Sequence, residues 1–219
     1  MSVNSSILLP VIDITKQRRI PPSMLVMEYF VNMEDIIIIE NSNNIYSPLY
    51  SKAPFELYGI KYNSVDEVYH CKLFSEVYGC KEAEKHIIGK DPAFYKTFVN
   101  QCLISIGKTS KDIVNWRIRS GINIIVEATA LKFKKNKELL NKLVEERHKV
   151  IFNAVGEDSY DACGPIDKLY KWIDEKYKES IMIPMEDPIV LEFFPTISEG
   201  KNVQGLLVML ARELILDSL

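Results

Sequence analysis

The 219-residue sequence contains no hydrophobic run that could cross a lipid bilayer. The longest apolar candidate, LLVML at residues 206–210, is far shorter than the roughly 20 residues that a membrane-spanning helix needs. The amino terminus has no basic segment ahead of its apolar stretch and reaches Pro10 and Asp13 early, which argues against a signal peptide. We therefore expect a cytoplasmic protein that has no membrane partner.

Patterns for disulfides, zinc and bulk nucleic-acid binding are also missing. The four cysteines are scattered and there are only three histidines, so no spacing fits a zinc site. We expect buried or unreactive thiols in a reducing compartment. The formal net charge of -3 argues against a protein that holds nucleic acid through overall positive charge, although a local basic groove stays open.

The composition that is present is typical of a globular protein, with 47% hydrophobic and 26% charged residues. Ser64, followed by Glu67 three positions later, is a capping-box arrangement that predicts a helix continuing through Phe74. A long apolar face predicts a second helix over residues 123–148 with a break near Asn136. Further helices are predicted over residues 81–88, 91–106, 109–119, 166–178 and 203–216.

The β elements are predicted to be few and short. Residues 35–41, DIIIIEN, indicate a buried strand, and residues 53–62 indicate a hairpin or a strand followed by a turn. IVLEFF at 189–194 is a further strand candidate, and prolines predict an irregular segment over residues 1–34. We therefore predict a mainly α protein with small β elements (α+β).

Four short patterns carry more information than a generic helical domain would need. The first is PFELYGIKYNSVDEVYHCKLF at 54–74, and the second is IVEATALKFKKNKELL at 125–140. The third is an acidic loop, NAVGEDSYDACG, at 153–164, and the fourth is GKNVQGLLVMLARELI at 200–215. Each pattern is weak alone, but four in this order are fairly specific.

This series resembles the NADAR family, also called YbiA-like proteins, over roughly residues 46–214. The second and fourth patterns keep nearly every position that marks the family. The resemblance implies one mainly helical domain over residues 35–219, with residues 1–34 as an extension and an insertion at about 165–199. It also implies an enzyme that hydrolyses the bond between a ribose and a nitrogen base and that uses no metal or other cofactor.

The resemblance implies a ribosyl substrate of one of two kinds. Family members act on phosphoribosylamino-pyrimidine intermediates of riboflavin synthesis, or they remove ADP-ribose from modified guanine. The partner is therefore expected to be a ribosyl or ADP-ribosyl small molecule, or an ADP-ribosylated base in nucleic acid.

Candidate catalytic residues follow from the same alignment of motifs. Breaking a ribose–nitrogen bond develops positive charge at the sugar, which a carboxylate can stabilise while it also activates water. The family's helix-start glutamate falls on Asp66, or on Glu67 after a slip of one residue. Asp158 matches the acidic residue of the family's loop. The competing interpretation is that these acids only favour a helix start and a turn.

The expected ligand-binding residues include two lysines, an arginine and two aromatic rings. Lys132 and Arg212 are cations among apolar neighbours and are suited to phosphate, or else to an internal ion pair. Tyr69 stands at an aromatic position of the family's helix. The family's loop tryptophan is replaced by Asp161, so the ring that stacks on a base would come from Trp116 or Trp172. The fifth expected ligand-binding residue, Lys201, belongs to the segment that starts at Gly200.

The segment Gly200-Lys201-Asn202 is predicted to bind phosphate or ribose. A helix that starts here would offer free backbone N–H groups and the positive end of its dipole, with charge added by Lys201. Asn202 is expected to cap the helix, and Gly205 to allow a helix or the ligand to come close. The alternative is a tightly packed terminal helix with no ligand.

The departures from the family pattern fall at polar site positions. Asn153 replaces a glutamate, Asp161 replaces the tryptophan, and Ser47-Pro48-Leu49-Tyr50 replaces an L-S-N-F segment. Two other functions therefore stay open. One is a non-catalytic module that binds ADP-ribose or a nucleotide, and the other is a structural or host-interaction protein that keeps only the fold.

Overall fold

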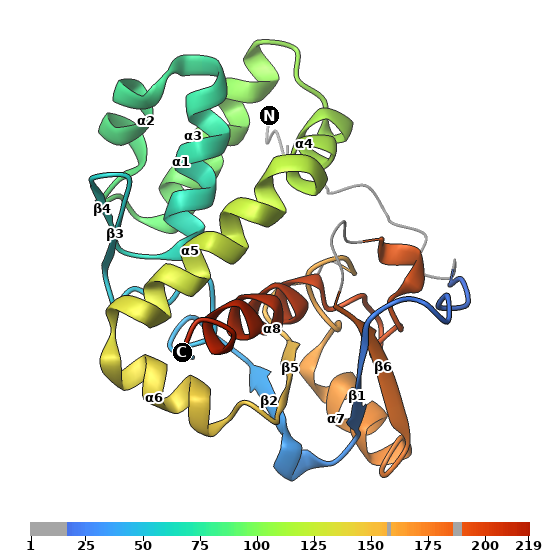
Figure 1. Ribbon diagram of the computed structural model, residues 1–219. Helices are drawn as coiled ribbons and strands as arrows, with labels where there is room; N and C mark the ends of the chain where they lie inside the picture. Colours follow the sequence, from blue (N-terminus) through green and yellow to red (C-terminus); the bar gives the residue numbers. More distant parts are fainter. Residues whose placement is uncertain (1–16, 157–158, 186–189) are drawn as a thin grey trace. The chain divides into compact units, whose positions relative to one another are not determined.

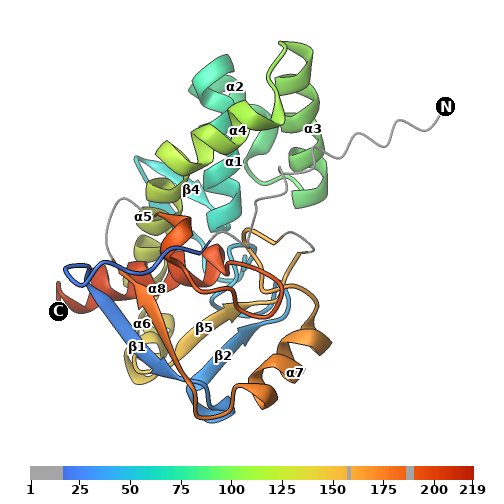
Figure 2. The same ribbon diagram turned by 90° about the vertical axis from the view of Figure 1, so that its right-hand side faces the viewer.

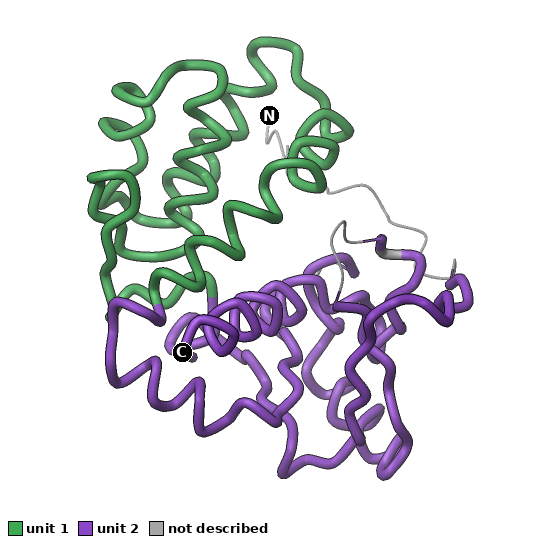
Figure 3. Tube along the Cα trace, in the orientation of Figure 1, with its two compact units in different colours: residues 1–11, 48–132 green, residues 12–47, 133–219 purple. Residues whose placement is uncertain are grey.

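The computed structural model describes residues 17–156, 159–185 and 190–219, and these residues form two compact units (Figure 3). Unit 1 comprises residues 48–132 of the described chain, and unit 2 comprises residues 17–47 together with the described residues from 133 onward. Asp158 lies outside the described residues. Of the described helices, none is both long and apolar enough to cross a membrane.

Unit 1 is a helical body with one small hairpin (Figure 1). Ser64 begins its first helix, because its Oγ accepts a hydrogen bond from the Glu67 N–H at 3.1 Å, and Gly79 ends that helix with a φ of 84°. Asp91 and Pro92 start the third helix in the same local way. The elements are β3 (Phe55–Leu57), β4 (Ile60–Tyr62), α1 (Val65–Tyr78), α2 (Cys80–Ile87), α3 (Pro92–Ser105), α4 (Ser110–Trp116), the π-helix η2 (Arg117–Gly121) and most of α5 (Ile122–Lys135).

The described part of unit 2 combines two small two-stranded sheets with three complete α-helices and two short 3-10 helices (Figures 1 and 2). β1 pairs antiparallel with β6, and β2 pairs parallel with β5. The elements are β1 (Val26–Phe30), η1 (Met33–Asp35), β2 (Ile36–Ile39), α6 (Lys137–Glu145), β5 (Val150–Asn153), α7 (Ile166–Glu175), β6 (Ser180–Pro184), η3 (Leu191–Phe193) and α8 (Val203–Leu216).

The core of unit 2 is centred on β5. All four residues of β5 are buried, and α8 packs along this strand with most of its own residues buried as well. On α7, the Trp172 ring meets Phe152 of β5 edge-on, with 6.0 Å between ring centroids. A strand and a helix that are buried on nearly every side have little surface for solvent, so they are held mainly by apolar packing.

The predicted fold class is confirmed. The predicted hairpin, the strand predicted at 35–41 and the predicted helices are also present, with shifts at their ends. The break predicted near Asn136 separates α5 from α6. Two predictions were wrong. β1 lies within the segment that was predicted to be irregular, and the predicted strand at 189–194 contains the 3-10 helix η3.

The strands β5 and β6 were not predicted. β6 ends at Pro184, and β1 is its only partner among the described residues, so this proline lies on a strand with a free edge, where proline is tolerated. β5 is only four residues long and follows directly on the helical pattern of α6. A short strand of this kind is stabilised by its pairing with β2 and by its packing against α8. These contacts leave no mark in the local hydrophobic periodicity of the sequence.

Candidate functional site

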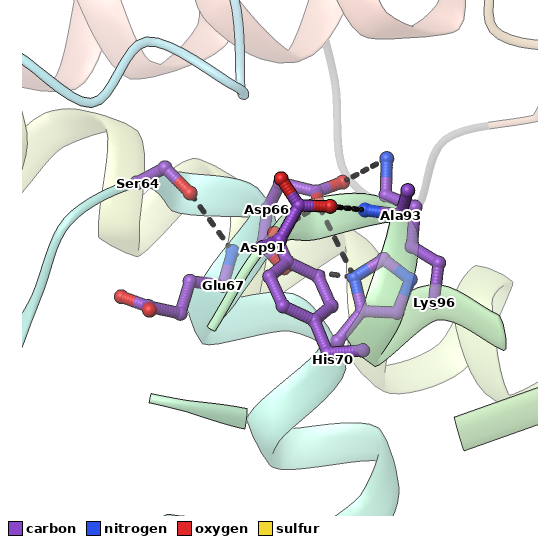
Figure 4. Close-up of polar contacts among 8 residues, drawn as sticks. Ser64, Asp66, Glu67, His70, Asp91, Ala93 and Lys96 are labelled. Carbon is purple, nitrogen blue, oxygen red and sulfur yellow. Dashed lines mark hydrogen bonds and ion pairs between the residues drawn. The ribbon is translucent and has the colours of Figure 1, made fainter. Parts of the chain in front are cut away.

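Asp66, in the first turn of α1, is the centre of a polar cluster in unit 1 (Figure 4). Its Oδ2 accepts a hydrogen bond from the Tyr95 hydroxyl at 2.6 Å, and its Oδ1 lies 3.1 Å from Lys96 Nζ. His70, one turn further along α1, places Nδ1 3.5 Å from Oδ2. The Asp66 side chain is 12% exposed, so the carboxylate is close to solvent without being surrounded by it.

The surroundings of Asp66 keep it ionised. Burial by itself would raise the pKa of the carboxyl group, but the neighbouring His70 and Lys96 and the Tyr95 hydroxyl outweigh burial and hold the pKa below its ordinary value. The same carboxylate, together with burial, raises the pKa of the Tyr95 hydroxyl, which therefore stays protonated and donates. Asp66 thus carries a fixed negative charge at neutral pH, paired with Lys96.

Glu67, the alternative to Asp66, has a different set of contacts. Its Oε2 accepts from the Asn63 backbone N–H and its Oε1 accepts from the Gly89 backbone N–H, each at 2.6 Å. The residue is buried, with 2% of its surface exposed. A buried carboxylate that satisfies two backbone donors holds loops together. The structure therefore favours Asp66 over Glu67 as the candidate catalytic carboxylate.

Tyr69 and Trp116, both predicted to bind ligand, lie against each other with ring centroids 5.3 Å apart. The Arg117 guanidinium lies 5.2 Å from the centre of the Tyr69 ring. Gly121 leaves room for these rings, because a Cβ at this position would lie 2.9 Å from Tyr69 Cε2 and the ring would have to shift. The π-helix η2 directly follows Trp116, and π-turns are frequent at functional sites.

The indole of Trp116 has an unused hydrogen-bond donor. Its Nε1 is buried and has no hydrogen-bond partner within the part of the chain that the structure describes. In contrast, Trp172 lies on α7 of unit 2, where its ring packs on Phe152 of the core. Trp116 differs from Trp172 in this buried donor without a partner, so we keep Trp116 as the candidate ring for a flat base, which stays a prediction.

With ADP-ribose as the expected ligand, replacing Trp116 by leucine is expected to raise its Kd about tenfold, because a stacked ring contributes roughly 1–3 kcal/mol per base. Isothermal titration calorimetry of the variant and the parent protein gives the ratio of Kd values. Trp172→Leu is the matched control and should leave Kd unchanged. An equal loss of affinity in both variants would contradict a specific role for Trp116.

Lys132 is a buried lysine on α5 with 1% of its surface exposed. Its Nζ lies 5.6 Å from the centre of the Tyr50 ring. Burial lowers the pKa of the Lys132 ammonium from 10.5 to about 7, so the charged and neutral forms coexist near neutral pH. A lysine perturbed in this way is a candidate for a functional site, and binding of an anionic ligand by Lys132 stays a prediction.

Relative to the parent protein, Lys132→Met is expected to be more stable at pH 6 than at pH 9.5 by roughly 3 kcal/mol, because the parent bears most of the cost of its buried charge at the lower pH. The folded-state pKa lies below the unfolded value, so the destabilisation by Lys132 is complete below pH 7 and fades between pH 7 and pH 10.5. The difference in unfolding free energy between variant and parent should therefore shrink from pH 6 to pH 9.5 in urea titrations. A difference that is constant over this range would contradict the lowered pKa.

The segment that starts at Gly200 does not form the predicted anion site. The backbone N–H groups of residues 201–204 are hydrogen-bonded to the carbonyl groups of residues 159–162, at 2.9 to 3.4 Å. Asn202 has a left-handed backbone with a φ of 54° and makes no side-chain cap. Its side chain instead joins β5, donating to the Ile151 carbonyl and accepting from the Asn153 N–H. The donors expected to be free for a phosphate are thus used within unit 2.

Both glycines of this segment have a packing reason. A Cβ on Gly200 would lie 1.8 Å from the Ala162 carbonyl oxygen, and a Cβ on Gly205 would lie 2.3 Å from the Ile151 carbonyl oxygen. Neither distance is compatible with a side chain unless backbone moves. The close approach at Gly205 is made by strand β5, and not by a helix or a ligand as predicted.

The two cations of this region also have internal partners. Lys201 is 2% exposed and its Nζ donates to the Phe194 carbonyl at 3.0 Å and to Thr196 Oγ1 at 3.2 Å. Arg212 is 1% exposed, and its guanidinium donates to the carbonyl of Lys149 at 2.6 Å and to the Tyr29 hydroxyl at 3.0 Å. We therefore assign both cations, which were predicted to bind phosphate, to the core of unit 2.

Asn153, at the end of β5, shapes the acidic loop. Its Nδ2 donates to the carbonyls of Val155 and Asp161, at 3.2 and 3.1 Å, and its Oδ1 accepts from the Val155 N–H. Where the resemblance leads one to expect a carboxylate, the chain has an amide that holds the loop. Asp158, the candidate acid of this loop, lies outside the described residues and stays a prediction.

Sequence reasoning missed Tyr95 and Lys96, which complete the cluster around Asp66. Both belong to α3 and carry no motif, and the contact with Asp66 joins residues about 30 positions apart. No group of three or more His, Cys, Asp or Glu residues that could hold a metal ion occurs in residues 17–156, 159–185 and 190–219.

Comparison of the structure with solved structures finds the E. coli protein YbiA, which was determined by NMR. The two share 15% sequence identity with a TM-score of 0.56 over 86% of this chain and 89% of YbiA. The chain has a YbiA-like fold. No protein-family model and no curated protein matches the sequence. The match covers most of both chains, and at 15% identity it shows a shared fold.

Proposed function

We propose that the chain is an N-glycoside hydrolase that cleaves a ribose–nitrogen bond in an ADP-ribosyl or phosphoribosyl compound. The observation that carries the proposal is the ionised, partly exposed Asp66 carboxylate at the start of α1, held by Tyr95 and Lys96. The order of the four sequence motifs and the YbiA-like fold support it. The family that the motifs resemble shares its name with this structural neighbour.

The proposed role of Asp66 is electrostatic. As the ribose–nitrogen bond breaks, positive charge develops at the anomeric carbon and the ring oxygen. A carboxylate that is fixed before the reaction stabilises this charge without reorganising. Tyr95 and Lys96 keep Asp66 ionised and in place, and 12% exposure of its side chain leaves it within reach of a bound sugar.

The proposed ligand contacts come from three residues of unit 1. Trp116 and Tyr69 offer aromatic surface to a base, and Trp116 Nε1 offers a donor. Lys132 has a pKa of about 7, and a bound phosphate would favour its charged form. ADP-ribosylated guanine and a phosphoribosylamino-pyrimidine both combine the required phosphate, ribose and base.

A second candidate function is a module that binds ADP-ribose without catalysing any reaction. The observation in its favour is Asn153. Its side-chain amide hydrogen-bonds to the acidic loop at a position where the resemblance implies a carboxylate. Such a protein would keep the contacts to phosphate and base and lose only the chemical step.

Product detection by mass spectrometry separates these functions. The purified protein is incubated with guanine-ADP-ribosylated nucleic acid, with NAD and with a phosphoribosylamino-pyrimidine, and the mixtures are searched for the free base and the ribosyl product. Release from one of these compounds is expected. Binding of ADP-ribose in calorimetry without any release would instead establish the non-catalytic module, and the absence of both would leave a protein that keeps only the fold.

A further inference from the structure

His70 is held in an orientation that leaves one ring nitrogen available. Its Nδ1 lies 2.8 Å from the backbone carbonyl oxygen of Asp66, one turn earlier in α1. A carbonyl oxygen only accepts, so Nδ1 carries the proton and, in the neutral ring, Nε2 carries the lone pair. Nε2 has no hydrogen-bond partner among the described residues, and Figure 4 draws contacts to only one of the two ring nitrogens.

The Asp66 carboxylate is poorly placed to accept a proton from water. Its Oδ2 already accepts from Tyr95, and its Oδ1 faces Lys96. The contacts that stabilise its charge also lower its basicity, and its pKa is below the ordinary value of an aspartate. A base that works near neutral pH needs a pKa much closer to 7.

We infer that His70 is the general base of the hydrolysis, through Nε2, and that Asp66 acts beside it as a fixed charge; this inference rests on the proposed function. Water gives a proton to Nε2 as its oxygen bonds to the anomeric carbon. The carbon–nitrogen bond breaks, and its electron pair leaves with the base. The imidazolium then returns the proton, through solvent, to the departing nitrogen, so one water is consumed and His70 is regenerated.

The environment of His70 suits this role. Its side chain is 13% exposed and so is not fully enclosed, and the rings of Tyr69 and Tyr95 pack against the imidazole with centroids 5.0 and 5.2 Å away. Burial lowers the pKa of the imidazole, and the positive charges of Lys96 and Arg117 act in the same direction, while Asp66 opposes them. The net result is a ring that is neutral at pH 7 and able to accept a proton.

The test is the pH dependence of kcat/KM for the parent protein and for His70→Gln, on the compound that gives product. Glutamine keeps an N–H donor but cannot take up a proton. We expect kcat/KM to fall about 100-fold or more, which is typical for the loss of a general base, with little change in KM. The kcat/KM of the parent protein should fall as the pH drops through the pKa of His70, which gives the pH profile an acid limb. The profile of His70→Gln should lack this acid limb.

Two further measurements exclude a merely structural role. His70→Ala should regain part of its activity when free imidazole is added, which a packing defect would not do. His86→Gln is the matched control, because His86 is a surface histidine of α2 that pairs with Glu82, and it should be fully active. Asp66→Asn should slow the reaction but keep the acid limb.

The outcomes distinguish the inference from the proposed function. An active parent protein whose His70→Gln variant keeps its rate and its acid limb would overturn the role of His70 and leave the hydrolase intact. A parent protein that releases no product from any of the three compounds would overturn both. If His70→Gln loses its rate and free imidazole restores activity to His70→Ala, His70 is established as the general base.

Discussion

Asp66→Asn is expected to lower kcat about 100-fold or more while the protein stays folded. The substitution keeps the size of the side chain and its ability to accept from Tyr95, but it removes the negative charge that faces the developing positive charge of the sugar. Lys96, whose side chain is 38% exposed, can turn towards solvent, so the loss of the ion pair should cost only about 1 kcal/mol of stability. Initial rates and urea unfolding of the same preparation measure both effects.

Glu67→Gln is the matched control for this prediction, because Glu67 is the neighbouring acid with the opposite role. It accepts two backbone N–H groups at 2.6 Å, so its neutralisation should lower the unfolding free energy by about 1–3 kcal/mol and leave kcat nearly unchanged. If Glu67→Gln abolished turnover and Asp66→Asn did not, the assignment of the two acids would be reversed.

Gly200→Ala is expected to destabilise the protein by about 3 kcal/mol or more. The added Cβ would lie 1.8 Å from the Ala162 carbonyl oxygen and 3.0 Å from that of Ser159, so backbone must move. The movement would also disturb the hydrogen bonds from residues 201–204 to residues 159–162 that hold the start of α8. Thermal and urea unfolding of the variant give the change in stability.

Glu199→Ala is the control for Gly200→Ala. Glu199 is the exposed neighbour of Gly200 and pairs with Lys168 at the surface, so its removal should change stability by about 0.5 kcal/mol or less. A Gly200→Ala variant as stable as Glu199→Ala would show that the loop at 159–162 moves away without cost, contrary to the packing described.

The sequence located α8 correctly but misjudged the role of its first residues. The apolar pattern that begins at Val203 is a local signal, and the helix begins there. What Gly200, Lys201 and Asn202 do depends on the loop at 159–162 and on strand β5, about 40 and 50 residues away. Glycine, lysine and asparagine before a helix fit an anion site and a packed loop equally well, and only the tertiary contacts separate the two.

The candidate site could be predicted in part for the same reason. Asp66 was found through the motif at the start of α1, and its choice over Glu67 needed the contacts of both carboxylates. Tyr95 and Lys96 are ordinary helix residues in the sequence, and their importance comes from the packing of α3 against α1. The lowered pKa of Lys132 likewise reflects burial, which a periodic pattern does not quantify.

The most direct test of the central claim is the release of free base by the parent protein and by Asp66→Asn, followed over time at equal concentrations of folded protein. We expect the parent protein to release base from a ribosyl or ADP-ribosyl compound in proportion to enzyme concentration, and the variant to release about 100-fold less or none. Equal release by both proteins would contradict the role of Asp66. Absence of release by the parent protein from every compound tested would contradict hydrolysis of a ribose–nitrogen bond.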